Sequence, residues 1–181
     1  MEVPQPRLPD TTFEALSLPL LDQLYNFAHW LTQDRAEAED LVQETYAKAL
    51  RGFSSFQLGT NFRAWMFRIL RNSFLSSKSG LKVTVPIEEE ELAPDAAREN
   101  STPESLLLEQ ANRETVRAAL AQLPVHLREI LLLCEVEEMS YQEIAQALSI
   151  PIGTVMSRLF RARQALRGQL TEKSIGARHG V

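Results

Sequence analysis

The segment from residue 140 to residue 166 constrains the fold most, because it predicts two helices joined by a tight turn. Ser140 stands three residues before Glu143, the spacing of a capping box that satisfies free backbone N–H groups at a helix start. A short turn is expected at 149–153, and a second helix beyond it. Each helix has one inward apolar stripe: Ile144, Ala145 and Leu148 in the first, and Val155, Leu159, Ala162 and Leu166 in the second.

The other face of the second predicted helix is polar and cationic. It carries groups that suit phosphates and the edges of bases in the major groove: Thr154, Ser157, Arg158, Arg161 and Gln164. A charged face alone is more often a solvated helix surface. The order of capped helix, short turn and basic second helix, however, favours a DNA-binding helix-turn-helix over an ordinary helical hairpin.

The first half of the chain also predicts helices. Apolar residues recur at helical spacing from Leu16 to Leu31, interrupted near Pro19, and a second helix is expected over 35–51. After a loop, Asn61 is expected to cap a third helix. Its inward stripe is predicted to be Phe62, Trp65, Met66, Ile69, Leu70, Ser73 and Phe74. No segment has the alternation of a strand, so the sequence predicts an all-α fold.

Charge is distributed unevenly along the 181 residues, although the net charge is −5. Residues 54–82 contain five basic side chains and no acidic one, and the charged residues of 140–181 are mainly basic. Between these two segments lies the acidic run Glu88–Glu91. This asymmetry indicates two candidate DNA-facing surfaces and an acidic connector. The sequence therefore predicts two helical domains, at 13–80 and 104–170, joined by a flexible acidic linker at 81–103.

Composition argues against several classes of protein. The one cysteine, Cys134, cannot form an internal disulfide, and the three histidines lack metal-ligand spacing. Cys134 lies in the apolar run 130–134 and is expected to be a small buried hydrophobe; that run is far shorter than the roughly 20 residues that cross a bilayer. No export signal, catalytic triad or phosphate-binding glycine loop is recognisable. We therefore expect a cytoplasmic protein without enzymatic activity, metal, cofactor or membrane insertion.

The chain beyond residue 122 contains seven short motifs: Leu123-Pro124, Arg128-Glu129, Ser140-Tyr141, Glu143-Ile144-Ala145, Gly153-Thr154-Val155, Ser157-Arg158-Leu159 and Arg161-Ala162-Arg163. Together they resemble the C-terminal domain of extracytoplasmic-function (ECF) sigma factors. The resemblance implies that the second helix of the helix-turn-helix reads the minus-thirty-five promoter element. It also implies that the base or phosphate contacts come from Thr154, Ser157, Arg158 and Arg161.

Two further motifs precede these: Asp40-Leu-Val-Gln-Glu-Thr-Tyr46 and Phe62-Arg-Ala-Trp-Met-Phe-Arg-Ile-Leu-Arg-Asn72. They are similar to the other conserved domain of the same family and occur in the family's order. The resemblance implies that the first motif docks on the clamp helices of the largest polymerase subunit, through Asp40, Gln43 and Glu44. Without the resemblance, this acidic face is more simply interpreted as solvated.

The loop and the third predicted helix resemble the part of the family that reads the minus-ten element and holds melted bases. The residues implied for this role are Phe56, Arg63, Trp65, Arg68, Arg71 and Asn72. Single-stranded bases need aromatic platforms and a cationic track, and both occur here. The position of Trp65 on the apolar stripe nevertheless favours a core role for that ring. The stretch Ser73–Ser79 has fewer basic residues than the family pattern, so duplex contacts there are not carried over.

The resemblance implies a sigma factor that binds core RNA polymerase and directs it to promoter DNA, with an anti-sigma factor as a further partner. Two alternatives remain at this point. The first is a free-standing helix-turn-helix regulator that dimerises through its N-terminal half, which predicts a palindromic site and tight DNA binding without polymerase. The second is a sigma mimic that binds only an anti-sigma protein.

Overall fold

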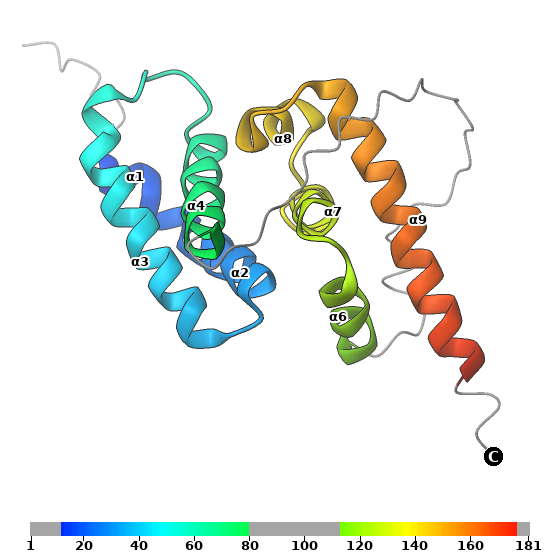
Figure 1. Cartoon of the computed structure of the whole chain (residues 1–181). Coiled ribbons are helices and arrows are strands. Elements are labelled where there is room, and N and C mark those ends of the chain that lie inside the picture. The colour runs from blue at the N-terminus through cyan, green and yellow to red at the C-terminus, as the bar shows by residue number, and fades with distance from the viewer. Residues whose placement is uncertain (1–11, 80–112, 177–181) are drawn as a thin grey trace, which may run out of the picture. The chain divides into compact units, whose positions relative to one another are not determined.

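The computed structural model describes residues 12–79 and 113–176, and helices are the only regular secondary structure in those two ranges (Figure 1). The all-α prediction is therefore confirmed. The chain divides after Phe74 into two compact units. The predicted acidic linker at 81–103 lies outside the described residues, so its limits and those of the two predicted domains stay predictions.

The described part of the N-terminal unit consists of α-helices joined by short 3-10 turns. Their order is α1 (Phe13–Ser17), η1 (Leu18–Leu20), α2 (Leu21–Thr32), α3 (Arg35–Gly52), η2 (Phe53–Ser55) and α4 (Phe62–Ser79), whose last residues pass the division point. Pro19 falls in η1, which confirms that it interrupts the first helical stretch. Asn61 caps α4 as predicted, since its Oδ1 accepts a hydrogen bond from the N–H of Ala64 at 2.9 Å.

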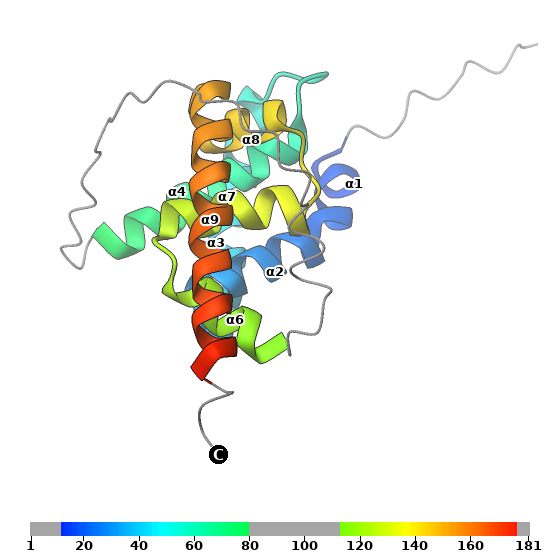
Figure 2. The same ribbon diagram turned by 90° about the vertical axis from the view of Figure 1, so that its right-hand side faces the viewer.

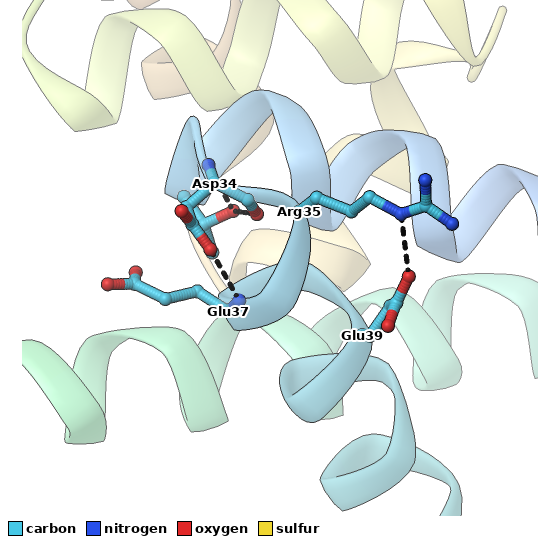
Figure 3. A network of polar contacts seen from close by, with 5 residues as sticks. Asp34, Arg35, Glu37 and Glu39 are labelled. Carbon is cyan, nitrogen blue, oxygen red and sulfur yellow. Dashed lines mark hydrogen bonds and ion pairs between the residues drawn. The ribbon is translucent and has the colours of Figure 1, made fainter.

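Side chains that are close in sequence fix the start of α3 (Figure 3). The hydroxyl of Thr32 donates to the carbonyl oxygen of Asp34 at 2.9 Å, and Oδ1 of Asp34 accepts from the N–H of Glu37 at 2.9 Å. One turn along the helix, Nε of Arg35 donates to Oε1 of Glu39 at 2.9 Å. The cap satisfies a backbone donor that the helix itself leaves without a partner. The start of α3 is therefore fixed by side chains that are close to it in sequence.

The core of this unit is formed by apolar residues of α2, α3 and α4. The rings of Phe27 on α2 and Phe67 on α4 lie 5.2 Å apart between centroids, and both residues are only 1% exposed. The inward stripe predicted for α4 differs from the structure at four positions. Trp65 and Ile69 are only half-buried, whereas Ala64 and Phe67, which were not assigned to the stripe, are buried. The buried part of α4 comprises more than one row of side chains: Phe62, Ala64, Met66, Phe67, Leu70, Ser73 and Phe74. The spacing of apolar residues within one helix does not show how much of its circumference is buried against the neighbouring helices.

The described part of the C-terminal unit contains α6 (Arg113–Gln122), α7 (Val125–Leu131), a π-helical turn η3 (Leu132–Val136), α8 (Tyr141–Leu148) and α9 (Ile152–Gly176). The helix α9 contacts α6, α7 and α8. Figure 2 shows it along its length, crossing α7. This helix is therefore held by three others in the described part of the chain.

The two helices α8 and α9 confirm the predicted helix-turn-helix. The capping box is present: the N–H of Ser140 donates to Oε2 of Glu143 at 2.8 Å, and the N–H of Glu143 donates to Oγ of Ser140 at 3.3 Å. The inward stripe of α9 is buried as expected, whereas in α8 Ala147 is buried and Ala145, expected inside, is half-buried. Cys134 is also half-buried rather than fully buried.

Candidate nucleic-acid interface

The helix α9 starts with a tight turn and exposes one side of its first four turns. The N–H groups of Thr154 and Val155 donate to the carbonyl oxygen of Pro151 at 3.0 and 3.1 Å, which anchors the helix start. Val155 and Leu159 then point into the core, at 0% and 1% exposure. The predicted contact residues lie outside this buried seam: Arg161 is exposed, and Thr154, Ser157 and Arg158 are half-buried.

The predicted contact residues of α9 are neighbours on its surface. Ser157 lies three residues after Thr154 and four before Arg161, so the three side chains follow one another along one face. The hydroxyl of Ser157 donates to the carbonyl oxygen of Thr154 at 3.1 Å, and its oxygen can still accept a hydrogen bond. Hydroxyl and guanidinium groups in such a row suit a mixture of base edges and phosphates.

A second row of exposed residues on α9 was missed by the sequence reasoning. Ile152, Met156 and Phe160 are each more than half exposed, at 51%, 56% and 53%. Their regular spacing of four residues, off the stripe that starts at Val155, is the sequence signal that could have identified them.

One arginine of α9 is used to hold the helix in place. The guanidinium of Arg163 donates from Nη2 to Oε1 of Glu135 at 2.8 Å and from Nε to the same oxygen at 3.3 Å, and so ties α9 to η3. The thiol of Cys134 lies 3.9 Å from the same guanidinium. Burial raises the pKa of Cys134 to about 11, and the neighbouring carboxylate of Glu135 adds to the effect. The thiol is therefore protonated at neutral pH, as expected for a residue with a packing role.

The cationic side of α9 also acts on α7. Burial lowers the pKa of His126 below its ordinary value, and repulsion from the positive charge of Arg158 lowers it further, with a smaller contribution from Arg161. Glu129 acts in the opposite direction. Since both arginines are predicted DNA contacts, His126 marks the place where α7 adjoins the candidate interface.

In the N-terminal unit, part of the predicted minus-ten surface is brought together on one side of α4. Trp65, Arg68 and Asn72 are three and four residues apart, so they share a face; Arg68 and Asn72 are exposed and Trp65 is half-buried. The ring of Phe56 adjoins this face, with its centroid 4.9 Å from that of Trp65. Arg71 is half-buried one turn along from Arg68.

Aromatic packing holds Phe56 in this position. Its ring is stacked on Phe53 at 6.2 Å between centroids and meets Phe62 edge to face at 5.2 Å. These contacts fix the loop that leads into α4 and leave Phe56 half-buried. The aromatic residues therefore first shape the loop, and only the ring surface that remains accessible can meet a base.

Arg63 lies apart from the other predicted minus-ten residues. Its Nε donates to Oε1 of Gln23 on α2 at 3.0 Å, and its guanidinium lies 5.7 Å from the centroid of the Phe67 ring. Positions 63 and 65 fall on opposite sides of an α-helix. In this structure Arg63 connects α4 to α2, while its role in DNA contact stays a prediction.

The predicted polymerase-binding residues form an exposed acidic face on α3. Asp40, Gln43 and Glu44 are all exposed and occupy positions i, i+3 and i+4. Glu44 is paired with Lys48 at 2.6 Å, and Nζ of Lys48 also donates to Oγ of Ser73 on α4 at 3.0 Å. The opposite side of the motif packs inward, since Leu41, Val42 and Thr45 are buried.

Two further findings concern membrane-spanning helices and metal-binding groups in the described residues. No helix in residues 12–79 or 113–176 combines the length and the apolar character needed to cross a membrane. The same residues contain no group of three or more His, Cys, Asp or Glu side chains placed to hold a metal ion.

Two family profiles match the chain. The Sigma-70 region 2 profile matches residues 18–81, which include α2, α3 and α4, and the Sigma-70 region 4 profile matches residues 113–166, which include the helix-turn-helix. The fold and the site together thus define a sigma factor with regions 2 and 4.

Comparison with individual proteins shows which family of sigma factors the chain resembles. The ECF RNA polymerase sigma factor SigE of Mycolicibacterium smegmatis is 36% identical over 156 residues, which cover 84% of this chain but only 59% of that protein. The RNA polymerase sigma-H factor of Pseudomonas aeruginosa is 34% identical over 157 residues, covering 81% of this chain and 78% of that protein. The sigma factor RpoE of Bartonella quintana, solved in complex with the anti-sigma factor NepR, has 31% identity and a TM-score of 0.68, over 88% of this chain and 96% of that one. The chain belongs to the ECF sigma factor family.

Proposed function

We propose that this ECF sigma factor binds core RNA polymerase and directs it to promoters whose minus-thirty-five element is read by α9. The observation that carries the proposal is the capped helix-turn-helix, in which the half-buried Thr154 and Ser157 and the exposed Arg161 lie outside the buried seam of α9. The protein acts in the cytoplasm and catalyses no reaction itself. The family assignment does not favour a free-standing regulator or a sigma mimic.

Recognition proceeds through two parts of the chain at once. The face of α4 formed by Trp65, Arg68 and Asn72 binds melted minus-ten bases by stacking and charge, and Phe56 extends it. The helix α9 binds the minus-thirty-five duplex. Because both parts belong to one chain, the second contact forms at a high effective concentration once the first has formed. Promoters are then selected by the separation of the two elements as well as by their sequences.

Anti-sigma control is the second part of the proposal. The similar Bartonella quintana protein was solved with an anti-sigma factor bound. We expect that an anti-sigma factor also binds this chain and competes with core polymerase or promoter DNA.

Run-off transcription with core polymerase on genomic fragments tests the DNA-binding proposal. Once a promoter is found, Arg161→Ala is expected to cost about 1–3 kcal/mol of binding free energy and to relax base preference at one position. Arg167→Ala is the matched control, since Arg167 is also an exposed arginine of α9. Equal losses for both variants at every promoter would mean that Arg161 contacts only phosphate. The complete absence of promoter-dependent transcripts would refute the function.

Charge reversal on α3 tests the polymerase-binding proposal. Asp40→Lys is the preferred variant, because Asp40 is exposed while the neighbouring Glu44 is engaged with Lys48. The variant is expected to fold normally and to co-elute less with core polymerase in gel filtration. Glu14→Lys, which reverses an exposed charge on α1, controls for net charge. Unchanged co-elution of Asp40→Lys with core would remove this residue from the interface.

A further inference from the structure

Four charged or titratable side chains form a cluster where α7 packs against α9. His126 and Glu129 lie three residues apart on α7, and Arg158 and Arg161 lie three residues apart on α9, so each pair occupies one side of its helix. The two helices are in contact, and α9 crosses α7 (Figure 2). His126 interacts electrostatically with both arginines of α9 and with Glu129 of its own helix. We call these four residues the α7–α9 cluster.

The members of the α7–α9 cluster differ in their access to solvent. The carboxylate belongs to Glu129, which is only 1% exposed. His126 and Arg158 are half-buried, and Arg161 is exposed. The acidic member is thus withdrawn from solvent, whereas the imidazole and the two guanidinium groups are the members that a ligand can reach. Their chemistry suits an anion.

The charges of the cluster keep the imidazole of His126 neutral in the free chain. Burial lowers the pKa of His126 below its ordinary value, and the positive charges of the two arginines lower it further, while Glu129 acts in the opposite direction. The π-helical turn η3 also contacts α7, and there Glu135 is engaged in the ion pair with Arg163. An anion placed beside the arginines would remove much of the repulsion that opposes protonation of the ring.

We propose that His126 takes up a proton when the minus-thirty-five duplex binds to α9 and, as an imidazolium, joins Arg158 in contacting the phosphate backbone. This inference rests on the proposed function. Phosphates line the groove in which a recognition helix lies, and elements beside that helix contact them. A phosphate next to Arg158 offsets the positive charge and favours the protonated ring. The DNA interface therefore extends from the helix-turn-helix onto α7, and promoter affinity is coupled to pH.

The coupling fixes the sign of the pH dependence. Because binding raises the pKa of His126, affinity is expected to be constant at high pH, to increase as the pH falls through the pKa of the bound state, and to level off below the pKa of the free state. The holoenzyme is assembled from core polymerase and the full chain, and its affinity for a promoter selected by run-off transcription is measured by fluorescence anisotropy from about pH 8 to about pH 5.5. We expect a gain of about three- to fivefold, the size of one added, partly exposed ion pair.

Histidine variants assign this gain to one side chain, since other groups of the holoenzyme also titrate. His126→Gln should lose the gain and otherwise keep the affinity measured at high pH. His29→Gln is the matched control, because His29 lies on α2 in the other compact unit, and this variant should keep the full gain. The wild-type salt dependence should also be steeper at low pH, by a slope of about 0.9, whereas that of His126→Gln should not change. Thermal melting at each pH verifies that the variants fold.

Two further measurements separate a phosphate contact from an indirect effect. In an NMR titration of the full chain, the pKa of His126 should rise when the minus-thirty-five duplex is added. Methylphosphonate at single backbone positions removes one phosphate charge and leaves the bases unchanged. At one position it should abolish the pH-dependent gain of the wild type, and it should not alter the pH response of His126→Gln, because the partner of that phosphate is already absent.

The outcomes separate this inference from the function on which it rests. A gain that is equal in the wild type and in His126→Gln, or a His126 pKa that the duplex does not raise, refutes the proton uptake and leaves the proposed function intact. A gain that survives methylphosphonate at every position refutes the phosphate contact. If the wild-type chain supports no promoter-dependent transcription, the proposed function fails and this inference fails with it.

Discussion

Arg128 allows a sharp test of what holds the C-terminal unit together. Its side chain is buried, at 8% exposure, and its Nη2 donates to the carbonyl oxygens of Ala121 at 2.9 Å and Leu123 at 3.1 Å. Carbonyl groups at the C-terminal end of a helix have no partner within that helix. Arg128 on α7 therefore satisfies the end of α6 and fastens the two helices together.

The size of the effect follows from these two hydrogen bonds. A hydrogen bond to a charged group contributes about 1.5–3 kcal/mol, so loss of the two bonds in Arg128→Met should destabilise the packing of α6 by about 3–6 kcal/mol. Methionine keeps much of the apolar contact of the arginine stem, so the loss reports mainly on the hydrogen bonds. Arg128→Lys keeps the charge but lacks the planar guanidinium that reaches both oxygens, and we expect about half the loss.

Hydrogen exchange on the full chain measures this effect and contains its own control. A loss of about 3 kcal/mol accelerates exchange of the α6 amides roughly 100-fold if they exchange through opening of this contact. The amides of α3 belong to the other compact unit and should be unaffected. If exchange in α6 changes by less than about fivefold in both variants, the hydrogen bonds of Arg128 do not hold α6 and the reasoning is wrong.

Two further predictions concern glycine and histidine. Gly168→Ala in α9 should stabilise the protein by about 0.5–1 kcal/mol, since a Cβ there meets nothing within 4 Å. Gly59→Ala should destabilise it, because Gly59 has φ of +90°. A variant whose melting temperature equals that of the wild type would contradict the prediction made for it. The folded-state pKa of His126 is below its ordinary 6.5, so stability should be lost as the pH falls below about 6.5, because the unfolded chain then binds more protons. Arg158→Gln should raise the His126 pKa in an NMR titration, and an unchanged value would show that the two groups do not interact.

The sequence by itself determined the elements whose stabilising contacts are local. The capping box of Ser140 and Glu143 and the cap at Asn61 join residues three positions apart, so the spacing of residue types was sufficient to predict them. The buried seam of α9 from Val155 to Leu166 was predicted from its period in the same way. These local signals placed the helix-turn-helix and the residues on its open face.

Only the tertiary structure decided which side chains the fold uses for itself. Arg63 donates to Gln23, which is 40 positions away, and Arg163 pairs with Glu135, which is 28 positions away. Nothing in the spacing of the sequence distinguishes these arginines from the exposed Arg161. The physical reason is that contacts between distant segments depend on the relative positions of packed helices, which a periodic pattern within one helix does not encode.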